Sequence, residues 1–133
     1  FKSFGADDAD ALAVLRNFVD VRFVTADHRG WPITEARIHT DMGFRLDLVP
    51  AAERLGWLSD LYSLARVAYM GDSFLDRPVL AGVGLGIAPS NASPRAKEVA
   101  TFVTDSAGGN GAVAEASFFI AEKIGAKPVE FDL

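Results

Sequence analysis

The chain has 133 residues, a length that suits one domain with a hydrophobic core and is too short for two. Half of the residues are apolar, yet no run approaches the roughly 18 to 20 consecutive apolar residues of a membrane span, and no basic leader precedes an apolar stretch. The absence of cysteine excludes disulfides and thiolate metal sites, and a formal net charge of −5 without a basic cluster argues against a nucleic-acid partner. We therefore expect one cytoplasmic domain, 1–133, that binds neither nucleic acid nor a membrane.

Helical and strand-like patterns alternate along the chain. The patterns predict, in chain order, a helix over 7–18, a strand over 19–27, a helix over 31–43, a strand over 44–48, a helix over 50–64, strands over 66–72 and 83–88, a helix over 91–100, a strand over 101–105 and a helix over 110–125. Strands that are apolar throughout are typical of a parallel sheet covered on both faces. The predicted class is doubly wound α/β, and the tail 126–133 has no clear period.

The residues that close the predicted strands carry the candidate chemistry, because ligands of an open parallel sheet bind at the carboxyl ends of its strands. These ends supply Thr25-Ala26-Asp27, then Gly71-Asp72-Ser73 with Asp76 following, Pro89-Ser90-Asn91, and Asp105 before the loop "SAGGNGA". Two carboxylates are ligands that suit Mg²⁺ together with a substrate phosphate. A threonine hydroxyl with its neighbouring amide suits phosphate oxygens.

The segment "VAYMGDSFLDRPVLAGVGLGIAPSNASPRAKEVATFVTDSAGGNGAVAEA" resembles the haloacid dehalogenase (HAD) superfamily of aspartyl phosphohydrolases over about fifty residues, without a gap. It is most similar to the capless branch that includes 3-deoxy-D-manno-octulosonate 8-phosphate phosphatases and the C-terminal module of CMP-sialate synthetases. The resemblance implies a three-layer, Rossmann-like HAD core with a mostly parallel five-stranded sheet. It also implies a homo-oligomer, a tetramer in relatives, whose C-terminal tails reach an adjacent site.

The resemblance assigns roles to five residues. It implies that Asp72 is a Mg²⁺ ligand, that Asp76 is its supporting carboxylate, and that Thr25 with Ala26 binds the substrate phosphate. Arg54 stands where the family normally has a lysine that neutralises the phosphate and the nucleophile, so it is the candidate catalytic and substrate-binding cation. An arginine keeps the charge of the lysine but not its compact donor geometry.

The sequence departs from the family pattern in three places and lacks one motif. Ser73 replaces the usual second acid, Ala26-Asp27 replaces Gly-Arg, and Asn110 and Ala114 stand where arginines are common. The family nucleophile lies in a DxD motif at the end of its first strand, and "GADDAD" is not that motif because it opens a helix. We therefore expect an N-terminally incomplete HAD-like domain whose sheet, without the first strand, has a gap or an unpaired edge.

Each assignment also has a simpler structural alternative. A Gly-Asp pair after a strand is often only a turn, Thr25 alone is an ordinary strand-end hydroxyl, and an arginine on a helix often faces solvent or forms a salt bridge. Asp27, His28 and Arg29 are more simply a polar loop, His39 is expected to face solvent, and Trp31 and Trp57 are expected to pack.

Two functions are consistent with these patterns. The first is a Mg²⁺-dependent phosphomonoesterase of a phosphorylated sugar or sugar acid, acting through a phosphoaspartate by the mechanism that the resemblance implies. The alternative is a catalytically inactive, HAD-like oligomerisation module linked to a CMP-sugar-acid synthetase. A DxD strand encoded before Phe1 would favour the enzyme, whereas a nucleotidyltransferase domain there would favour the module.

Overall fold

The computed structural model describes residues 7–26, 35–41 and 43–126. Within them the α-helices are α1 (Asp8–Leu15), α3 (Ala51–Leu61), α4 (Arg77–Gly82), α5 (Pro94–Val99) and α6 (Ala112–Lys123). The strands are β1 (Arg22–Thr25), β2 (Arg45–Leu48), β3 (Ala68–Met70), β4 (Leu85–Ala88) and β5 (Phe102–Val103). Three further helical segments are η1 (Ala36–Asp41), which is π-helical, and the 3₁₀ turns η2 (Leu64–Arg66) and η3 (Phe74–Asp76). None of the described helices is long and apolar enough to cross a membrane.

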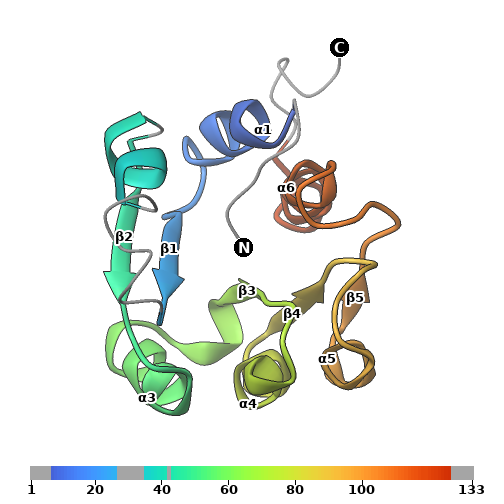
Figure 1. Ribbon diagram of the computed structural model, residues 1–133. Coiled ribbons are helices and arrows are strands. Elements are labelled where there is room, and N and C mark those ends of the chain that lie inside the picture. The colour runs from blue at the N-terminus through green and yellow to red at the C-terminus, as the bar shows by residue number, and fades with distance from the viewer. Residues whose placement is uncertain (1–6, 27–34, 42, 127–133) are drawn as a thin grey trace.

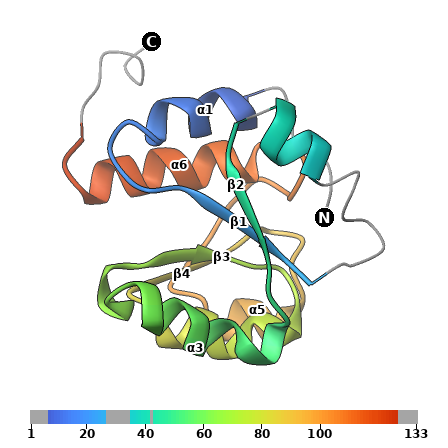
Figure 2. The same ribbon diagram turned by 90° about the vertical axis from the view of Figure 1, so that its left-hand side faces the viewer.

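The described elements form three layers. Helices α1 and α6 lie on one side of the strands, and α3, α4 and α5 lie on the other (Figures 1 and 2). All strand pairs in the described part of the chain are parallel. The α/β class, the three layers and the parallel pairing predicted from the sequence are therefore confirmed.

The strands form two sheets rather than one continuous ladder. Strands β1 and β2 pair in one sheet, with Thr25 opposite Leu48, while the order in the other sheet is β3-β4-β5. No ladder joins β1 to β3 among the described residues. The sheet is thus interrupted between its first two and its last three strands, as a gap in the predicted sheet requires.

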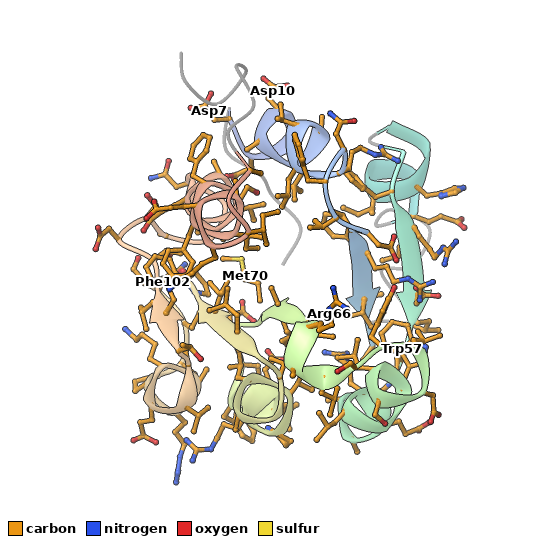
Figure 3. All side chains as sticks on the ribbon, turned by 180° about the vertical axis from the view of Figure 1, so that it is seen from behind. Asp7, Asp10, Trp57, Arg66, Met70 and Phe102 are labelled. Atoms are coloured by element: carbon orange, nitrogen blue, oxygen red, sulfur yellow. The ribbon has the colours of Figure 1, made fainter. Side chains whose placement is uncertain are left out.

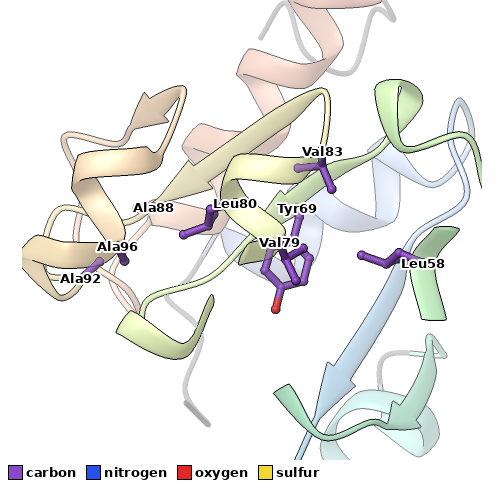
Figure 4. Close-up of a cluster of buried hydrophobic side chains, with 8 residues drawn as sticks. All are labelled: Leu58, Tyr69, Val79, Leu80, Val83, Ala88, Ala92 and Ala96. Carbon is purple, nitrogen blue, oxygen red and sulfur yellow. The ribbon is translucent and has the colours of Figure 1, made fainter. Parts of the chain in front are cut away.

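A cluster of buried side chains fills the space between the second sheet and α3, α4 and α5. Its members are Leu58, Tyr69, Val79, Leu80, Val83, Ala88, Ala92 and Ala96 (Figure 4). A smaller cluster of Leu12, Ile38 and Phe44 lies under α1. The small residues Ala88 and Ala96 are completely buried, which lets α5 approach β4 closely.

On the other face of the strands, α1 and α6 are joined by a buried carboxylate. The Asp8 side chain has no exposed surface, and its Oδ1 accepts a hydrogen bond of 2.8 Å from the Ala114 amide in the first turn of α6. A negative charge at this position also complements the dipole of α6. Nearby, the Met70 side chain points from β3 toward α6 (Figure 3).

Several predicted elements need correction. Helix α4 has no counterpart among the predicted elements, which assign no structure between the strands over 66–72 and 83–88. The predicted helix over 31–43 is described only over 36–41, where it is π-helical, and Gly43 follows it with a positive φ of 75°. Helix α1 ends at Leu15, three residues before the predicted end at Phe18, and Phe18 is 47% exposed. Pro32, Trp31, the loop 27–29 and the tail 127–133 lie outside the described residues.

Candidate functional site

The turn after β3 is held by a helix cap. Ser73 precedes η3, and its Oγ accepts a hydrogen bond of 3.1 Å from the Leu75 amide. In return the Ser73 amide donates to Oδ2 of Asp76 at 2.9 Å. The reciprocal pair is a capping box, the arrangement that a Ser-x-x-Asp spacing favours at the start of a helix. Ser73, which replaces an acid of the family pattern, is therefore the cap of the segment that carries Asp76.

The Asp76 carboxylate is buried and fully engaged. Its Oδ1 accepts hydrogen bonds from the Tyr69 hydroxyl at 2.8 Å and from Nη1 of Arg54 at 3.3 Å, while its Oδ2 accepts from the Ser73 amide. The Asp76 and Arg54 side chains are each only 9% exposed. Both oxygens of this buried carboxylate are therefore satisfied by protein donors.

Arg54 connects the two sheets at their carboxyl ends. Its Nη2 donates to the backbone oxygen of Val49, the residue after β2, at 2.8 Å, and its Nη1 donates to the Tyr69 hydroxyl on β3 at 2.9 Å. The Val49 amide in turn donates to the backbone oxygen of Thr25 at the end of β1. A chain of hydrogen bonds thus runs from Thr25 to Asp76 across the interruption between the sheets. The Nε of Arg54 is buried without a hydrogen-bond partner among the described residues.

Tyr69 is the member of this group that the sequence analysis missed. Its ring lies in the main hydrophobic cluster, and its hydroxyl points out of that cluster (Figure 4). Burial, followed by the negative charge of Asp76, raises the pKa of the Tyr69 hydroxyl well above its ordinary value, although Arg54 opposes the shift. The hydroxyl therefore stays protonated and acts as a donor to Asp76. A tyrosine in an otherwise apolar strand is the signal for such a partner, but it does not show which residue the partner is.

Asp72 differs from Asp76 in its exposure and in the contacts of its carboxylate. Its side chain is exposed, and no hydrogen bond or ion pair joins its carboxylate to another described residue. Its backbone oxygen accepts a hydrogen bond of 2.8 Å from the Ser93 amide at the start of α5. The structure thus holds the Asp72 backbone in place and leaves its carboxylate open to a ligand.

The predicted site residues fall into a connected group and two separate positions. Arg54 and Asp76 are in direct contact, and Thr25 joins them through backbone hydrogen bonds. Asp72 lies one residue before the Ser73 amide that Asp76 holds, and Ala26 is exposed after β1. No group of three or more histidine or acidic side chains that would hold a metal ion occurs in residues 7–26, 35–41 and 43–126. The catalytic, substrate-binding and metal-binding roles assigned to these five residues remain predictions.

A depression of about 610 Å³ lies next to β2 and α3, and its lining includes Val49, which is hydrogen-bonded to Arg54 and Thr25. The lining also includes Asp47, Glu53, Trp57 and Asp60 but none of the predicted site residues. Trp57 itself is half-buried, with the Arg22 guanidinium 5.8 Å from the centre of its ring. It therefore packs, as predicted. His39 is exposed, also as predicted.

The loop after β5 is anchored to α6 by Glu115. Its two carboxylate oxygens accept hydrogen bonds of 2.9 Å from the amides of Asp105 and Ser106. Partial burial alone raises the pKa of Glu115, but the hydrogen bonds from these amides and from the Ser106 side chain outweigh it and hold the pKa below its ordinary value. The Gly108 amide also donates to Asn91, so this loop borders the loop after β4.

This anchor predicts a pH-dependent contribution to stability. Because the folded state lowers the pKa of Glu115, the contribution is present above the ordinary carboxyl pKa of about 4.5 and is lost as the pH falls through the lower folded value. We expect Glu115→Gln to lower the free energy of unfolding at pH 7 and to differ progressively less from the wild type below pH 4.5. Urea unfolding across pH, with the exposed Glu122→Gln as the control, measures this difference; a pH-independent difference would contradict the anchor.

Comparison with known proteins identifies the segment that carries Asp72 and Asp76. Residues 59–116 match the family of haloacid dehalogenase-like hydrolases. The chain is 48% identical over 50 residues to the 3-deoxy-D-manno-octulosonate 8-phosphate phosphatase of Yersinia pestis, a match that covers 38% of this chain and 27% of that protein. The chain thus aligns with about a quarter of the length of this relative.

Solved structures extend the similarity to the whole fold. A structure of 3-deoxy-D-manno-octulosonate 8-phosphate phosphatase from Yersinia pestis is 27% identical, with a TM-score of 0.76 over 95% of this chain and 70% of that one. The corresponding phosphatase from Moraxella catarrhalis, in complex with a magnesium ion, a phosphate ion and a KDO molecule, is 23% identical, with a TM-score of 0.76 over 92% of this chain and 72% of that one. The resemblance predicted from the sequence is thereby confirmed in the matched segment and in the fold.

Proposed function

From the haloacid dehalogenase-like character of this chain, we propose that it is the metal-binding and phosphate-binding part of a Mg²⁺-dependent phosphomonoesterase that acts on a phosphorylated sugar acid. The observation that carries the proposal is the contrast between two aspartates in the matched segment. Asp72 is exposed with an open carboxylate, while Asp76, four residues later, is buried and engaged by three donors. An open carboxylate on a rigid turn is the kind of group that binds a metal ion, and the relatives reported above are phosphatases by name.

The residues of this chain would have different roles in such a site. Asp72 would hold the ion. Asp76 would support Asp72 indirectly, because it fixes the amide of the next residue, Ser73. Thr25 and Ala26, at the end of β1, would bind the substrate phosphate through a hydroxyl and an amide. Arg54 is too buried for its Nε to reach a ligand, so it would contribute mainly its positive charge and the connection between the sheets.

Magnesium fits this site as a weakly held ion. When bound, it supplies positive charge that offsets the charge developing on the transferred phosphoryl group. Asp72 is the one predicted metal ligand with an open carboxylate, because the oxygens of Asp76 already accept hydrogen bonds from protein donors. Magnesium commonly keeps several waters and takes one or two carboxylates, so millimolar binding is expected from these residues.

The metal assignment predicts the effect of one substitution. Titration of the 133-residue chain with Mg²⁺ is expected to shift the amide resonances of residues 71–77, and Asp72→Asn is expected to abolish the shifts because it removes the open negative charge. NMR titration measures both. The matched control is Asp10→Asn, an exposed aspartate on α1, which should leave the shifts unchanged. A response that persists in Asp72→Asn would overturn the assignment.

The alternative function, an inactive oligomerisation module linked to a synthetase, is not favoured by the relatives reported above. Assembly itself remains part of our proposal, because the resemblance implies a homo-oligomer for the phosphatase as well. The phosphorylated substrate is identified only by class. The matched relatives suggest a sugar acid.

A further inference from the structure

We propose that Tyr69 is a positioning residue that, together with Arg54, holds Asp76 in the orientation that fixes the Asp72–Ser73 turn, and that it thereby sets how tightly Asp72 binds Mg²⁺. The inference rests on the proposed function. Tyr69 is not among the site residues predicted from the sequence, and it is not part of the proposed phosphatase site.

The contacts of Asp76 show why the tyrosine matters. Oδ1 of Asp76 has two donors, and the Tyr69 hydroxyl at 2.8 Å is closer than Nη1 of Arg54 at 3.3 Å. The same Nη1 also donates to the Tyr69 oxygen at 2.9 Å, so the three groups form a closed triangle. Removal of the hydroxyl would leave Oδ1 with only its longer contact and Arg54 with one acceptor fewer.

The opposite oxygen of Asp76 transmits this orientation to the turn. Oδ2 accepts the hydrogen bond of the Ser73 amide, and the Asp76 side chain packs directly on Gly71. A Cβ at Gly71 would lie 2.5 Å from Cγ of Asp76, which leaves no room for any other residue there. Asp76 therefore contacts the turn on both sides of Asp72, and a rotated Asp76 carboxylate would change the backbone that presents the Asp72 carboxylate.

The ring of Tyr69 is held by the hydrophobic core. Its ring belongs to the cluster with Leu58, Val79 and Leu80, so the hydroxyl is delivered from a side chain that cannot reorient freely. Groups one step removed from a metal ligand commonly change metal affinity by about ten- to a hundredfold when they are removed. Tyr69 acts on Asp72 only through Asp76 and so lies two steps from the ligand rather than one, and we therefore expect an effect at the lower end of that range.

The test compares two tyrosines in the 133-residue chain. Tyr69→Phe is expected to weaken Mg²⁺ binding about tenfold in the NMR titration and to speed hydrogen exchange of the Ser73 amide. The matched control is Tyr62→Phe, which removes another hydroxyl that donates to an aspartate, Asp20, away from this turn. It should leave the Mg²⁺ affinity unchanged.

The outcomes separate this inference from the proposed function. A wild-type chain without any Mg²⁺ response would overturn the metal site and, with it, the role of Tyr69. A wild-type response that Tyr69→Phe leaves unaltered, even with a lower melting temperature, would overturn the positioning role alone. If Tyr69→Phe does not fold, Arg54→Lys serves instead. A lysine keeps the charge beside Asp76 but has no fork to reach Tyr69 and Val49 together, so an unchanged affinity in that variant would equally refute the inference.

Discussion

Replacing Asp76 with alanine is expected to lower the free energy of unfolding by about 3 to 5 kcal/mol, because it leaves a buried guanidinium without its counter-charge. Arg54 would keep only the Tyr69 hydroxyl and the Val49 carbonyl as acceptors, with its side chain 9% exposed. The Ser73 amide would lose its acceptor at the same time. Urea unfolding followed by circular dichroism measures the loss.

The neighbouring aspartate provides the control for this prediction. Asp72→Ala removes an exposed carboxylate and should change stability by no more than about 0.5 kcal/mol. The double variant Arg54→Met/Asp76→Leu removes both buried charges together and should be less destabilised than Asp76→Ala, since no uncompensated charge remains. A loss below about 1 kcal/mol in Asp76→Ala would show that the Arg54–Asp76 pair does not hold the turn.

The polypeptide of residues 1–133 alone is expected to hydrolyse p-nitrophenyl phosphate in Mg²⁺ at least about 10⁴-fold more slowly than a complete enzyme of this type, since residues that act as one catalytic unit lose nearly all activity when one member is removed. Of its two predicted site carboxylates, Asp76 is occupied by protein donors and Asp72 is assigned to the metal. Neither is left as a nucleophile. A steady-state phosphate-release assay on the purified chain measures the rate.

Supplying a strand with the DxD motif of the family is the complementary experiment. An apolar strand that ends in DxD, fused before Phe1 or supplied as a separate peptide, should restore turnover if the chain is part of a phosphatase. The same strand with both aspartates changed to asparagine is the matched control and should not restore it. Robust hydrolysis by residues 1–133 alone would contradict this prediction and would place the nucleophile within the chain, with Asp27→Ala the first variant to test. No turnover after restoration would count against the phosphatase and favour the assembly module.

The fold class could be predicted from the sequence because it follows from local patterns, and the same patterns place the candidate site residues at strand ends. Apolar strands and intervening helical periods indicate parallel α/β layers, and the structure confirms them. Polar residues after β1 and β3 lie at the carboxyl ends of parallel strands, where such sheets bind ligands. The Ser73-x-x-Asp76 spacing is likewise local. It signals the capping box and the start of η3 and α4, a signal that the sequence analysis did not use.

The contacts and the exposure of individual side chains were decided by the tertiary structure. The sequence shows two aspartates four residues apart, but only the folded chain shows that Asp76 is buried against Tyr69 and Arg54 while Asp72 is open. Arg54 precedes Tyr69 by 15 residues and Asp76 by 22, and these side chains meet because α3 packs beside β3 and η3. Spacing in the sequence fixes which residues share a strand or a helix face, whereas the partner of a long polar side chain depends on how separate elements pack.

The interruption of the sheet also depends on how separate elements pack. Each strand is recognisable by its own residues, since β-branched and aromatic side chains favour extended backbone. Whether β1 and β3 share a ladder depends on the hydrogen-bond partners available at their edges, and the sequence of neither strand determines that. In the described part of the chain Arg54 makes this connection instead, by hydrogen bonds to Val49 and Tyr69. The residue types of this protein thus determine its layers and the edge where we expect ligands to bind, while the packing of those layers determines which charged groups at that edge remain open to a ligand.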